Sequence, residues 1–292
     1  MTETAPAASK FIQHRGLTIP TFLYGTAWKE NQTEALAYNA IKAGFLGIDT
    51  ANQRRHYFEA GVGKAVKQAI DEQLVQRSEL FLQTKFTFVS SQDDRLPYDP
   101  KADYTTQVQQ SFASSLEHLQ TDYLDSYVLH GPAVRDGLSD VDWEVWQAME
   151  SLYKSGVVRL LGVSNVSYGQ LQTLIKHSQI KPAFVQNRCY ARSQWDAKIR
   201  QLCLENDAIY QGFSLLTANT TALQKPKITG IAKRLSCTVP QLVFRFALQL
   251  GMMPLTGTSS EKHMNADLAS YGLELNPSDI AIIEQIASGT GS

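Results

Sequence analysis

Short apolar runs alternate along this chain with longer segments in which apolar residues recur at helical spacing. The segment 33–43 carries Ala35, Leu36, Ala40 and Ile41 at that spacing, and the apolar run 45–48 after it indicates a short buried strand. The same rhythm predicts eight strands, at 22–24, 45–48, 80–84, 123–129, 158–163, 183–185, 208–214 and 252–256. Eight strands that alternate with helices predict an α/β fold, a single (β/α)8 TIM barrel with a parallel sheet.

Helices are predicted between these strands and after the last one. Their expected ranges are 33–43, 59–70, 103–119, 143–154, 168–177, 196–206, 240–250 and 277–286. Ahead of the barrel, residues 11–14 and 17–19 flank Arg15-Gly16 and predict a β-hairpin placed to plug one end. The domain is therefore expected to cover 11–288, after a disordered N-terminal tail at 1–10 that is small and polar.

Polar residues follow several of the predicted strands at the same relative position. Those residues are Asp49, Lys85, His130, Asn165, Gln186, Ser214 and Thr256. In a parallel barrel the carboxyl ends of the strands form one face, where reactive groups are expected. An aspartate after a strand is more often a cap or turn former, and a tyrosine such as Tyr57 is more often a packing residue. The repetition around the chain favours a site, and the polar loop 90–103, with Pro97 and Pro100, lies on the same rim.

Composition and charge exclude several classes of protein. The chain is 43% hydrophobic and 19% charged, and its 27 basic and 28 acidic residues give a net charge of −1. Since no basic cluster with interleaved aromatic residues is present, nucleic acid is not an expected partner. No apolar run is long enough for a membrane span, and the first ten residues lack the pattern of a secretory signal, so we expect a cytoplasmic protein with no membrane partner. Cys189, Cys203 and Cys237 show no CxxC spacing, and neither disulfides nor a metal site is expected.

A set of short motifs, in a fixed order, resembles one known family. They are GTAW at 25–28, GIDTA at 47–51, EAGVG at 59–63, QTK at 83–85, YLDSYVLHGP at 123–132, GVSN at 162–165, VQN at 185–187, FSLL at 213–216 and PLTGTSS at 254–260. Over residues 11 to 288 the chain resembles the aldo-keto reductases. Each motif alone is weakly specific, whereas their order and spacing together are strong.

The resemblance implies a reductase that moves a hydride from a nicotinamide cofactor to the carbonyl of a small aldehyde or ketone. It implies a catalytic tetrad of Asp49, Tyr57, Lys85 and His130 beneath that carbonyl. Negative charge builds on the carbonyl oxygen during hydride transfer, and a group that donates a proton there lowers the barrier. Tyr57 is the expected acid. Lys85 is expected to lower its pKa, Asp49 to hold Lys85, and His130 to orient the carbonyl.

The family pattern also implies where the cofactor and the substrate bind. Ser164, Asn165 and Gln186 would bind the nicotinamide carboxamide, Phe213 would stack on the ring where tyrosine is more usual, and a helix after Ser260 would attract phosphate. The full cofactor set is Gly25, Thr26, Ala27, Asp49, Ser164, Asn165, Gln186, Phe213, Ser214, Leu216, Thr256, Gly257, Thr258, Lys262 and Asn265. Trp28, Phe88 and His130 would contact the substrate, with Tyr57 and the 90–103 loop adding to the pocket wall. The few residues after the last helix predict an open, tolerant pocket.

Two departures from the family pattern matter. The spacing from Asp49 to Tyr57 is three residues longer than usual, so the loop with the acid is rebuilt, and His56 is the group that would replace Tyr57. Leu255 stands where many members have a lysine for the 2′-phosphate of NADP, and Lys262 is the expected substitute. We expect NADP(H) to be favoured over NAD(H).

Two other functions remain open from the sequence. The chain could be a cofactor-binding regulatory subunit of the same fold, with little turnover. It could also be a barrel aldolase or isomerase in which Lys85 forms a Schiff base, although Asp49 beside Lys85 disfavours this. Turnover of NADPH with a panel of aldehydes separates these functions, and the expected assembly is a monomer.

Overall fold

Eight parallel strands form a closed barrel in this computed structural model, which describes residues 9–287. The order around the barrel is β10-β3-β4-β5-β6-β7-β8-β9, and every neighbouring pair is parallel. The strands are β3 (Leu23–Gly25), β4 (Gly47–Asp49), β5 (Phe81–Phe86), β6 (Leu124–Leu129), β7 (Val158–Ser164), β8 (Phe184–Arg188), β9 (Ile209–Phe213) and β10 (Met253–Thr256). The predicted barrel and all eight of its strands are confirmed.

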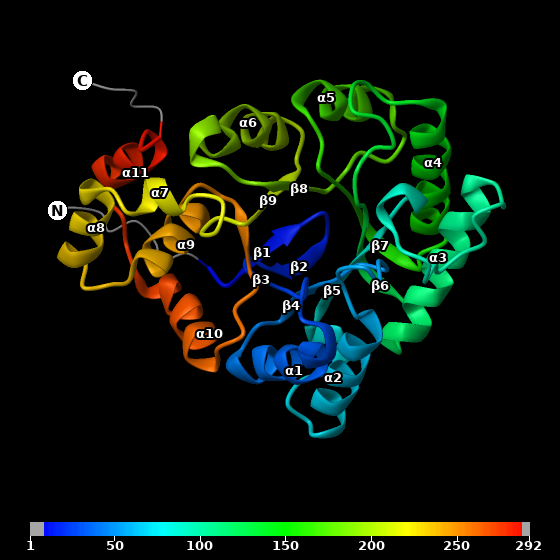
Figure 1. Ribbon diagram of the computed structural model, residues 1–292, viewed down its shortest axis with the longest axis horizontal. Helices are drawn as coiled ribbons and strands as arrows, with labels where there is room; N and C mark the ends of the chain where they lie inside the picture. The colour runs from blue at the N-terminus through cyan, green and yellow to red at the C-terminus, as the bar shows by residue number, and fades with distance from the viewer. Residues whose placement is uncertain (1–8, 288–292) are drawn as a thin grey trace.

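The helices surround this barrel as an outer layer (Figure 1). They are α1 (Thr33–Ala43), α2 (Glu59–Asp71), α3 (Tyr104–Leu119), α4 (Asp140–Lys154), α5 (Tyr168–His177), α6 (Ala197–Glu205), α7 (Thr220–Leu223), α8 (Pro226–Arg234), α9 (Val239–Gln249), α10 (Glu261–Leu268) and α11 (Pro277–Glu284). Short 3-10 helices are η1 (Glu30–Gln32), η2 (Arg77–Glu79), η3 (Val89–Ser91), η4 (Ala191–Asp196) and η5 (Ala269–Gly272). The apolar residues of the outer layer and the strands form the main core, which includes Phe22, Phe45, Trp146 and Phe244.

Two helical features differ from the sequence prediction. Helix α4 begins at Asp140 rather than at residue 143, because Ser139 and Asp142 form a capping box one turn earlier. No helix was predicted for the stretch that contains the short α7 and, after it, α8. Pro226 begins α8, and Ile228 and Ile231 are buried on one face.

An antiparallel hairpin, β1 (Phe11–His14) and β2 (Leu17–Pro20), precedes the barrel, as predicted. Arg15 and Gly16 have φ values of 47° and 81°, which the tight hairpin turn requires. The Arg15 guanidinium donates to the carbonyl oxygens of Lys181, Pro182 and Asp207, which lie just before β8 and β9. The hairpin therefore lies at the amino ends of the strands and leaves their carboxyl ends open (Figure 1).

The predicted tail at 1–10 falls outside the described residues except for Ser9 and Lys10. The carbonyl oxygens of these two residues accept hydrogen bonds from Thr21. Among residues 9–287, no helix has both the length and the apolar character that crossing a membrane requires. The monomeric state and the cytoplasmic location stay predictions.

Candidate active site

A buried ion pair between Asp49 and Lys85 lies at the carboxyl ends of β4 and β5. Lys85 Nζ donates to Asp49 Oδ1 and Oδ2 and to the carbonyl oxygen of Thr50, each at 2.7 Å. The two side chains are 3% and 0% exposed. Burial lowers the pKa of the Lys85 ammonium, and the charge and hydrogen bonds of Asp49 oppose that shift. An ammonium has three N–H donors, and three acceptors are already present.

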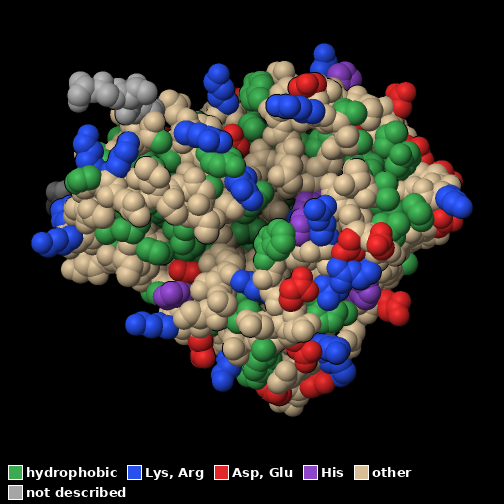
Figure 2. All heavy atoms as spheres, in the orientation of Figure 1, with side chains coloured by type: hydrophobic (Ala, Val, Ile, Leu, Met, Phe, Trp, Pro, Cys, Tyr) green, Lys and Arg blue, Asp and Glu red, His purple; other side chains and the backbone are tan. Residues whose placement is uncertain are grey.

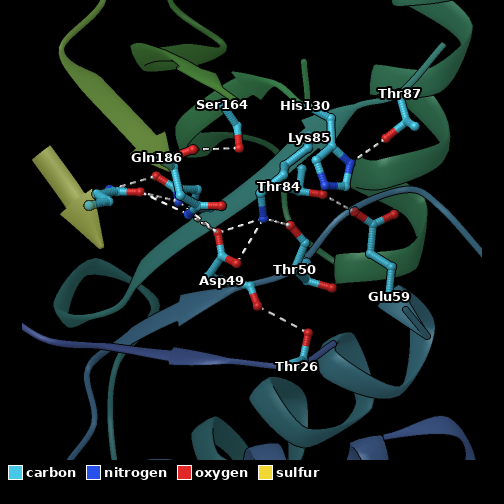
Figure 3. A network of polar contacts seen from close by, with 12 residues as sticks. Thr26, Asp49, Thr50, Glu59, Thr84, Lys85, Thr87, His130, Ser164 and Gln186 are labelled. Carbon is cyan, nitrogen blue, oxygen red and sulfur yellow. Dashed lines mark hydrogen bonds and ion pairs between the residues drawn. The ribbon is translucent and has the colours of Figure 1, made fainter. Parts of the chain in front are cut away.

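Three glutamine carboxamides extend this pair across the barrel interior. Gln83 Nε2 donates to Asp49 Oδ1 at 2.7 Å and to Gln211 Oε1 at 2.8 Å, and Gln186 Nε2 donates to the same two oxygens at 3.0 and 2.9 Å. Gln211 Nε2 returns a hydrogen bond to Gln83 Oε1 at 3.0 Å. Figure 3 shows Asp49 and Lys85, from the neighbouring strands β4 and β5, and Gln186, from β8 across the barrel, pointing toward one another. We call Gln83, Gln186 and Gln211 the carboxamide cluster.

His130 follows β6 and is held on two sides. Its Nδ1 lies 2.7 Å from Thr87 Oγ1, and its carbonyl oxygen accepts a hydrogen bond from Asn165 Nδ2 at 2.7 Å. Burial, assisted by the positive charge of Lys85, lowers the pKa of His130 to about 3. The imidazole is therefore neutral at physiological pH.

Tyr57 lies beside these groups, in the rebuilt segment after Asp49. Its ring centroid is 5.9 Å from that of His130, and Lys85 Nζ lies 5.3 Å from it. Burial and the negative charge of Asp49 raise the pKa of Tyr57 above its usual value. The net shift is therefore opposite to the predicted one, because burial and the Asp49 charge outweigh any lowering by Lys85, whose three donors are directed at Asp49 and Thr50.

His56, the alternative acid, lies on the opposite side of the same segment. Its ring stacks on that of Trp28 with centroids 4.0 Å apart, and its Nδ1 lies 3.0 Å from Gln53 Oε1. Burial and the nearby Arg55 lower the pKa of His56.

The residues expected to hold the nicotinamide carboxamide come together at the ends of β7 and β8. Ser164 Oγ donates to the Gln186 carbonyl oxygen at 2.6 Å, and Asn165 Nδ2 donates to Ser164 Oγ at 3.1 Å. Within residues 9–287, neither Asn165 Oδ1 nor Gln186 Oε1 accepts a hydrogen bond. A carboxamide NH2 group needs acceptors of this kind, so the residues fit the amide end of a nicotinamide.

The expected phosphate-binding residues lie where the chain leaves β10 and enters α10. Thr258 Oγ1 accepts from the Ser260 amide at 3.2 Å, and Ser260 caps α10. The Thr256 hydroxyl instead points toward α10 and donates to Asp267 at 2.7 Å. Burial raises the pKa of Asp267 to about 6.

The other residues in the expected cofactor set lie around the same end of the barrel. Gly25 ends β3, with Thr26 and Ala27 directly after it, and Phe213, Ser214 and Leu216 lie at and beyond the end of β9. Lys262 and Asn265 are exposed on α10. Lys29 was not predicted, yet its ammonium donates to the carbonyl oxygen of Gly257 and so lies between the β3 and β10 ends.

Two cavities border the rebuilt segment. The first, which we call the His130 cavity, has a volume of about 620 Å³ and is lined by Gln53, Arg55, His56, Thr87, Phe88, Ser90, Ser91, His130, Gly131, Pro132, Ala133, Val134, Arg135, Asn165 and Gln170. The second, the Tyr57 cavity, has a volume of about 390 Å³ and is lined by Ala51, Asn52, Gln53, Arg54, Tyr57, Phe58, Glu59, Ala60, Arg95, Leu96, Pro97, Ser114 and His118.

The predicted substrate contacts divide between these cavities and the surface. Phe88, His130 and the start of the 90–103 loop line the His130 cavity, as expected for the substrate pocket. Tyr57 instead lines the other cavity, and Trp28 lines neither of them. Trp28 is 71% exposed because its indole lies over His56 on the outside of the segment.

Comparison with known proteins agrees with this arrangement. Residues 21–288 match the sequence model of the Aldo/keto reductase family. The chain belongs to the aldo-keto reductase family. Members are generally NAD(P)H-dependent enzymes that reduce carbonyl groups.

Several aldo-keto reductases are similar over almost the whole chain. A glyoxal reductase of Bacillus subtilis is 32% identical over 277 residues, which cover 94% of this chain and 91% of that protein. Prostaglandin F synthase 2 of Bos taurus is 25% identical, covering 98% and 93%. The crystal structure of an aldo/keto reductase from Brucella melitensis superposes with a TM-score of 0.80 at 26% identity, covering 94% of this chain and 98% of that one.

Some residues around the aldo-keto reductase site escaped the sequence prediction. Gln83 and Gln211 each lie inside a buried strand, where a polar side chain is unusual, and that signal was available in FLQTKF and IYQGF. Gln170 is 3% exposed and holds the loop after His130 through three hydrogen bonds. No sequence pattern pointed to it, since its partners are backbone atoms more than thirty positions away.

Proposed function

We propose that this aldo-keto reductase reduces the carbonyl group of a small aldehyde or ketone with NADPH, and that Tyr57 is the general acid. The observation that carries the proposal is the buried Asp49 and Lys85 pair beside a neutral His130 and an accessible cavity. Unpartnered acceptors on Asn165 and Gln186 support a nicotinamide cofactor at the same end of the barrel. The similarity to proteins described as a glyoxal reductase and an NAD(P)H-dependent D-xylose reductase supports it further.

A nicotinamide held by Ser164, Asn165 and Gln186 would supply a hydride ion, that is, a proton with two electrons, to the carbonyl carbon. Tyr57 then gives its phenolic proton to the carbonyl oxygen, so the product is the alcohol and the phenolate later regains a proton from water. A raised pKa keeps the phenol protonated until negative charge builds on that oxygen. Lys85 lies over the Tyr57 ring and stabilises the phenolate that forms after the transfer.

His130 orients the carbonyl in this scheme. If Thr87 donates its hydroxyl proton to Nδ1, the neutral imidazole carries its own proton on Nε2. That N–H then donates to the carbonyl oxygen. With the pKa near 3, the imidazole stays a neutral donor throughout the physiological range and does not compete with Tyr57 as the acid.

Two lysines support NADPH over NADH. Lys262 lies in the first turn of α10, is exposed and has no partner among the described residues. Lys29 reaches the Gly257 carbonyl oxygen between β3 and β10. A cationic side chain near the 2′-phosphate contributes roughly 1.5 to 3 kcal/mol through a charge-assisted hydrogen bond, less where it is exposed.

The experiment that tests the function follows NADPH oxidation by absorbance with a panel of aldehydes and ketones. We expect turnover with several of them, and loss of most of it in Tyr57→Phe at unchanged nucleotide affinity. Tight nucleotide binding without turnover of any carbonyl compound would point instead to the regulatory subunit. Absence of both binding and turnover contradicts the proposal.

A further inference from the structure

The charged residues that line the His130 cavity are all positive. Its lining includes two arginines, Arg55 and Arg135, and no aspartate, glutamate or lysine. Its two histidines are neutral at physiological pH, because the pKa of His130 is lowered to about 3 and that of His56 is also lowered. Among residues 9–287, the two guanidinium groups are therefore the only charged groups that line the cavity. In Figure 2 this face of the molecule is hollowed near its centre, with basic and histidine side chains beside the hollow.

Neither of these arginines has a partner of its own. Among residues 9–287, no ion pair, side-chain hydrogen bond or aromatic ring is found for the guanidinium of Arg55 or of Arg135. Arg54, one position before Arg55, does have partners. It pairs with Glu30 at 3.2 Å, donates to the Tyr57 carbonyl oxygen at 3.4 Å and lies 4.6 Å from the Phe58 ring centroid. Of these two adjacent arginines, Arg54 thus has a structural role and Arg55 is unpaired.

The backbone that carries Arg135 is fixed in place. Gln170 Nε2, from the start of α5, donates to the carbonyl oxygens of Val134, Arg135 and Gly137 at 3.0, 3.3 and 2.9 Å. Gln170 is only 3% exposed, so these contacts are shielded from water. The position of Arg135 is therefore set by a buried side chain, although its guanidinium reaches solvent.

The backbone that carries Arg55 is fixed in a similar way. The Gln53 carbonyl oxygen accepts from the amides of His56 at 3.1 Å and Tyr57 at 3.0 Å, which closes a tight turn around Arg55. Gln53 Nε2 donates to the Ser91 carbonyl oxygen at 2.6 Å, which joins this turn to the 90–103 loop. Both arginines are thus presented to one cavity by preorganised segments.

We propose that the substrate is a carbonyl compound with an anionic oxygen group, a carboxylate or a phosphate, which binds to Arg55 and Arg135 while its carbonyl lies at His130. The proposal rests on the proposed function and names its substrate class. A guanidinium offers paired N–H donors that match the oxygens of either anion, and it stays charged at every relevant pH. Two unpaired cations at a cavity free of carboxylates also attract anions from solution.

The first experiment compares matched probes that differ in charge. The kcat/KM with NADPH is measured for 4-formylbenzoate and for its methyl ester, which keeps the size and the aldehyde but removes the charge. We expect the carboxylate to be preferred by about 10-fold at low salt, and the preference to shrink as ionic strength rises. Glyceraldehyde 3-phosphate against glyceraldehyde distinguishes a phosphate preference from a carboxylate preference.

The second experiment removes each cation. Arg55→Gln and Arg135→Gln should each raise KM for the preferred anionic probe by about 5- to 10-fold. The rise in KM for the matching neutral probe should be several-fold smaller. Arg192→Gln is the matched control, because Arg192 is exposed, lies 4.4 Å from the Tyr190 ring and does not line the cavity. This control variant should leave KM for both probes unchanged.

A binding measurement keeps this inference separate from turnover. Titration of 4-(hydroxymethyl)benzoate into the NADP-loaded protein should give weaker binding in both variants than in the wild type. The proposed anionic substrate is overturned if the neutral probes have the same kcat/KM as the anionic probes or a higher one. It is also overturned if the variants lose activity equally on both kinds of probe. Either result leaves the proposed reductase function intact. Lack of turnover with every probe, together with no anion binding, overturns both.

Discussion

The two cavities beside the segment 51–58 differ in how their charges are satisfied. In the Tyr57 cavity, Arg54 pairs with Glu30, and Glu59 is hydrogen-bonded by His118 at 3.0 Å and by the Thr84 hydroxyl. In the His130 cavity, Arg55 and Arg135 have no partner among the described residues. Paired charges on one side hold the segment in place, and unpaired charges on the other remain available to a ligand. The segment 51–58 thus has a structural wall, the side facing the Tyr57 cavity, where charges are paired. Its other side, facing the His130 cavity, is a binding wall, where the arginines are unpaired.

Tyr57 lies on the boundary between these two regions. Its ring borders the Tyr57 cavity, while its contacts are to His130 and Lys85. If the comparison holds, changes to the groups between the cavities affect catalysis, and changes to the paired charges affect mainly stability. The following predictions test that difference, from the largest expected effect to the smallest.

The largest effect is expected from Lys85→Met. This change leaves the Asp49 carboxylate buried and without its cation, which costs roughly 3 to 5 kcal/mol of stability. Urea unfolding measures the loss, and NADPH oxidation should fall by about 10²-fold or more. The matched control is the double variant Asp49→Asn with Lys85→Met, which should regain most of the stability and none of the activity. Recovery of activity in the double variant would show that the pair serves the fold alone.

The next effect concerns the acid itself. Tyr57→Phe removes a hydroxyl that makes no hydrogen bond within residues 9–287, so stability should hardly change. Carbonyl reduction should fall by about 10²-fold, as is typical when a general acid is lost. His56→Ala is the comparison, and it should cost only a few-fold, through lost contacts with Trp28 and Gln53. If His56→Ala abolishes turnover while Tyr57→Phe keeps it, histidine is the acid of the rebuilt loop.

The carboxamide cluster should show a smaller effect on both stability and rate. Gln83→Leu removes a donor to Asp49 and leaves Gln211 Nε2 without its Gln83 acceptor, at a cost of about 1 to 3 kcal/mol. Adding Gln211→Leu removes the Gln211 amide that lost its acceptor and should restore part of the stability, although Gln186 Nε2 then keeps only its hydrogen bond to Asp49. Urea unfolding of the single and double variants measures this. If the double variant loses as much stability as the two single variants together, the glutamines do not depend on one another and the cluster is contradicted.

The fold was predictable because its signals are local and repeated. Each strand is a short apolar run, most helices have their own apolar periodicity, and several begin at a capping side chain, as at Asp103, whose side chain accepts from the Thr106 amide. Helix α8 was missed because Pro226, Thr229 and Gly230 interrupt its apolar pattern and indicate a loop when considered locally. Packing of Ile228 and Ile231 against the core decides the outcome there.

The site residues at strand ends were predictable from the sequence. The contacts between residues on opposite sides of the barrel were not. Asp49 and Lys85 lie at the carboxyl ends of β4 and β5, and His130 follows β6, so their meeting follows from the parallel barrel. Gln83 and Gln211 meet across the interior, which is set by the register and tilt of the closed sheet rather than by either strand. The raised Tyr57 pKa likewise depends on how deeply Tyr57 is buried and on the Asp49 charge near it, which spacing does not reveal.

The smallest effect is expected on the structural wall, at His118. The hydrogen bond to Glu59 raises the pKa of His118, so its folded value lies above its unfolded one. A raised histidine pKa adds stability that is fully present below the unfolded pKa of about 6.5 and is lost as pH rises through the folded pKa. Because the His118 side chain is 39% exposed, solvent screening limits the gain to roughly 0.5 to 1 kcal/mol.

The test compares the free energy of urea unfolding of wild type and His118→Gln across a range of pH. The difference should be largest below the unfolded pKa of about 6.5 and should shrink as pH rises through the raised folded pKa, because only the protonated imidazole gains from the carboxylate. His177→Gln is the control, since His177 is exposed and its Nδ1 faces the Thr173 carbonyl oxygen rather than a carboxylate. NADPH oxidation by His118→Gln should stay near that of the wild type. A large loss of turnover at unchanged stability would mean that the Tyr57 cavity is part of the reaction site, and the division between a structural wall and a binding wall would then be wrong.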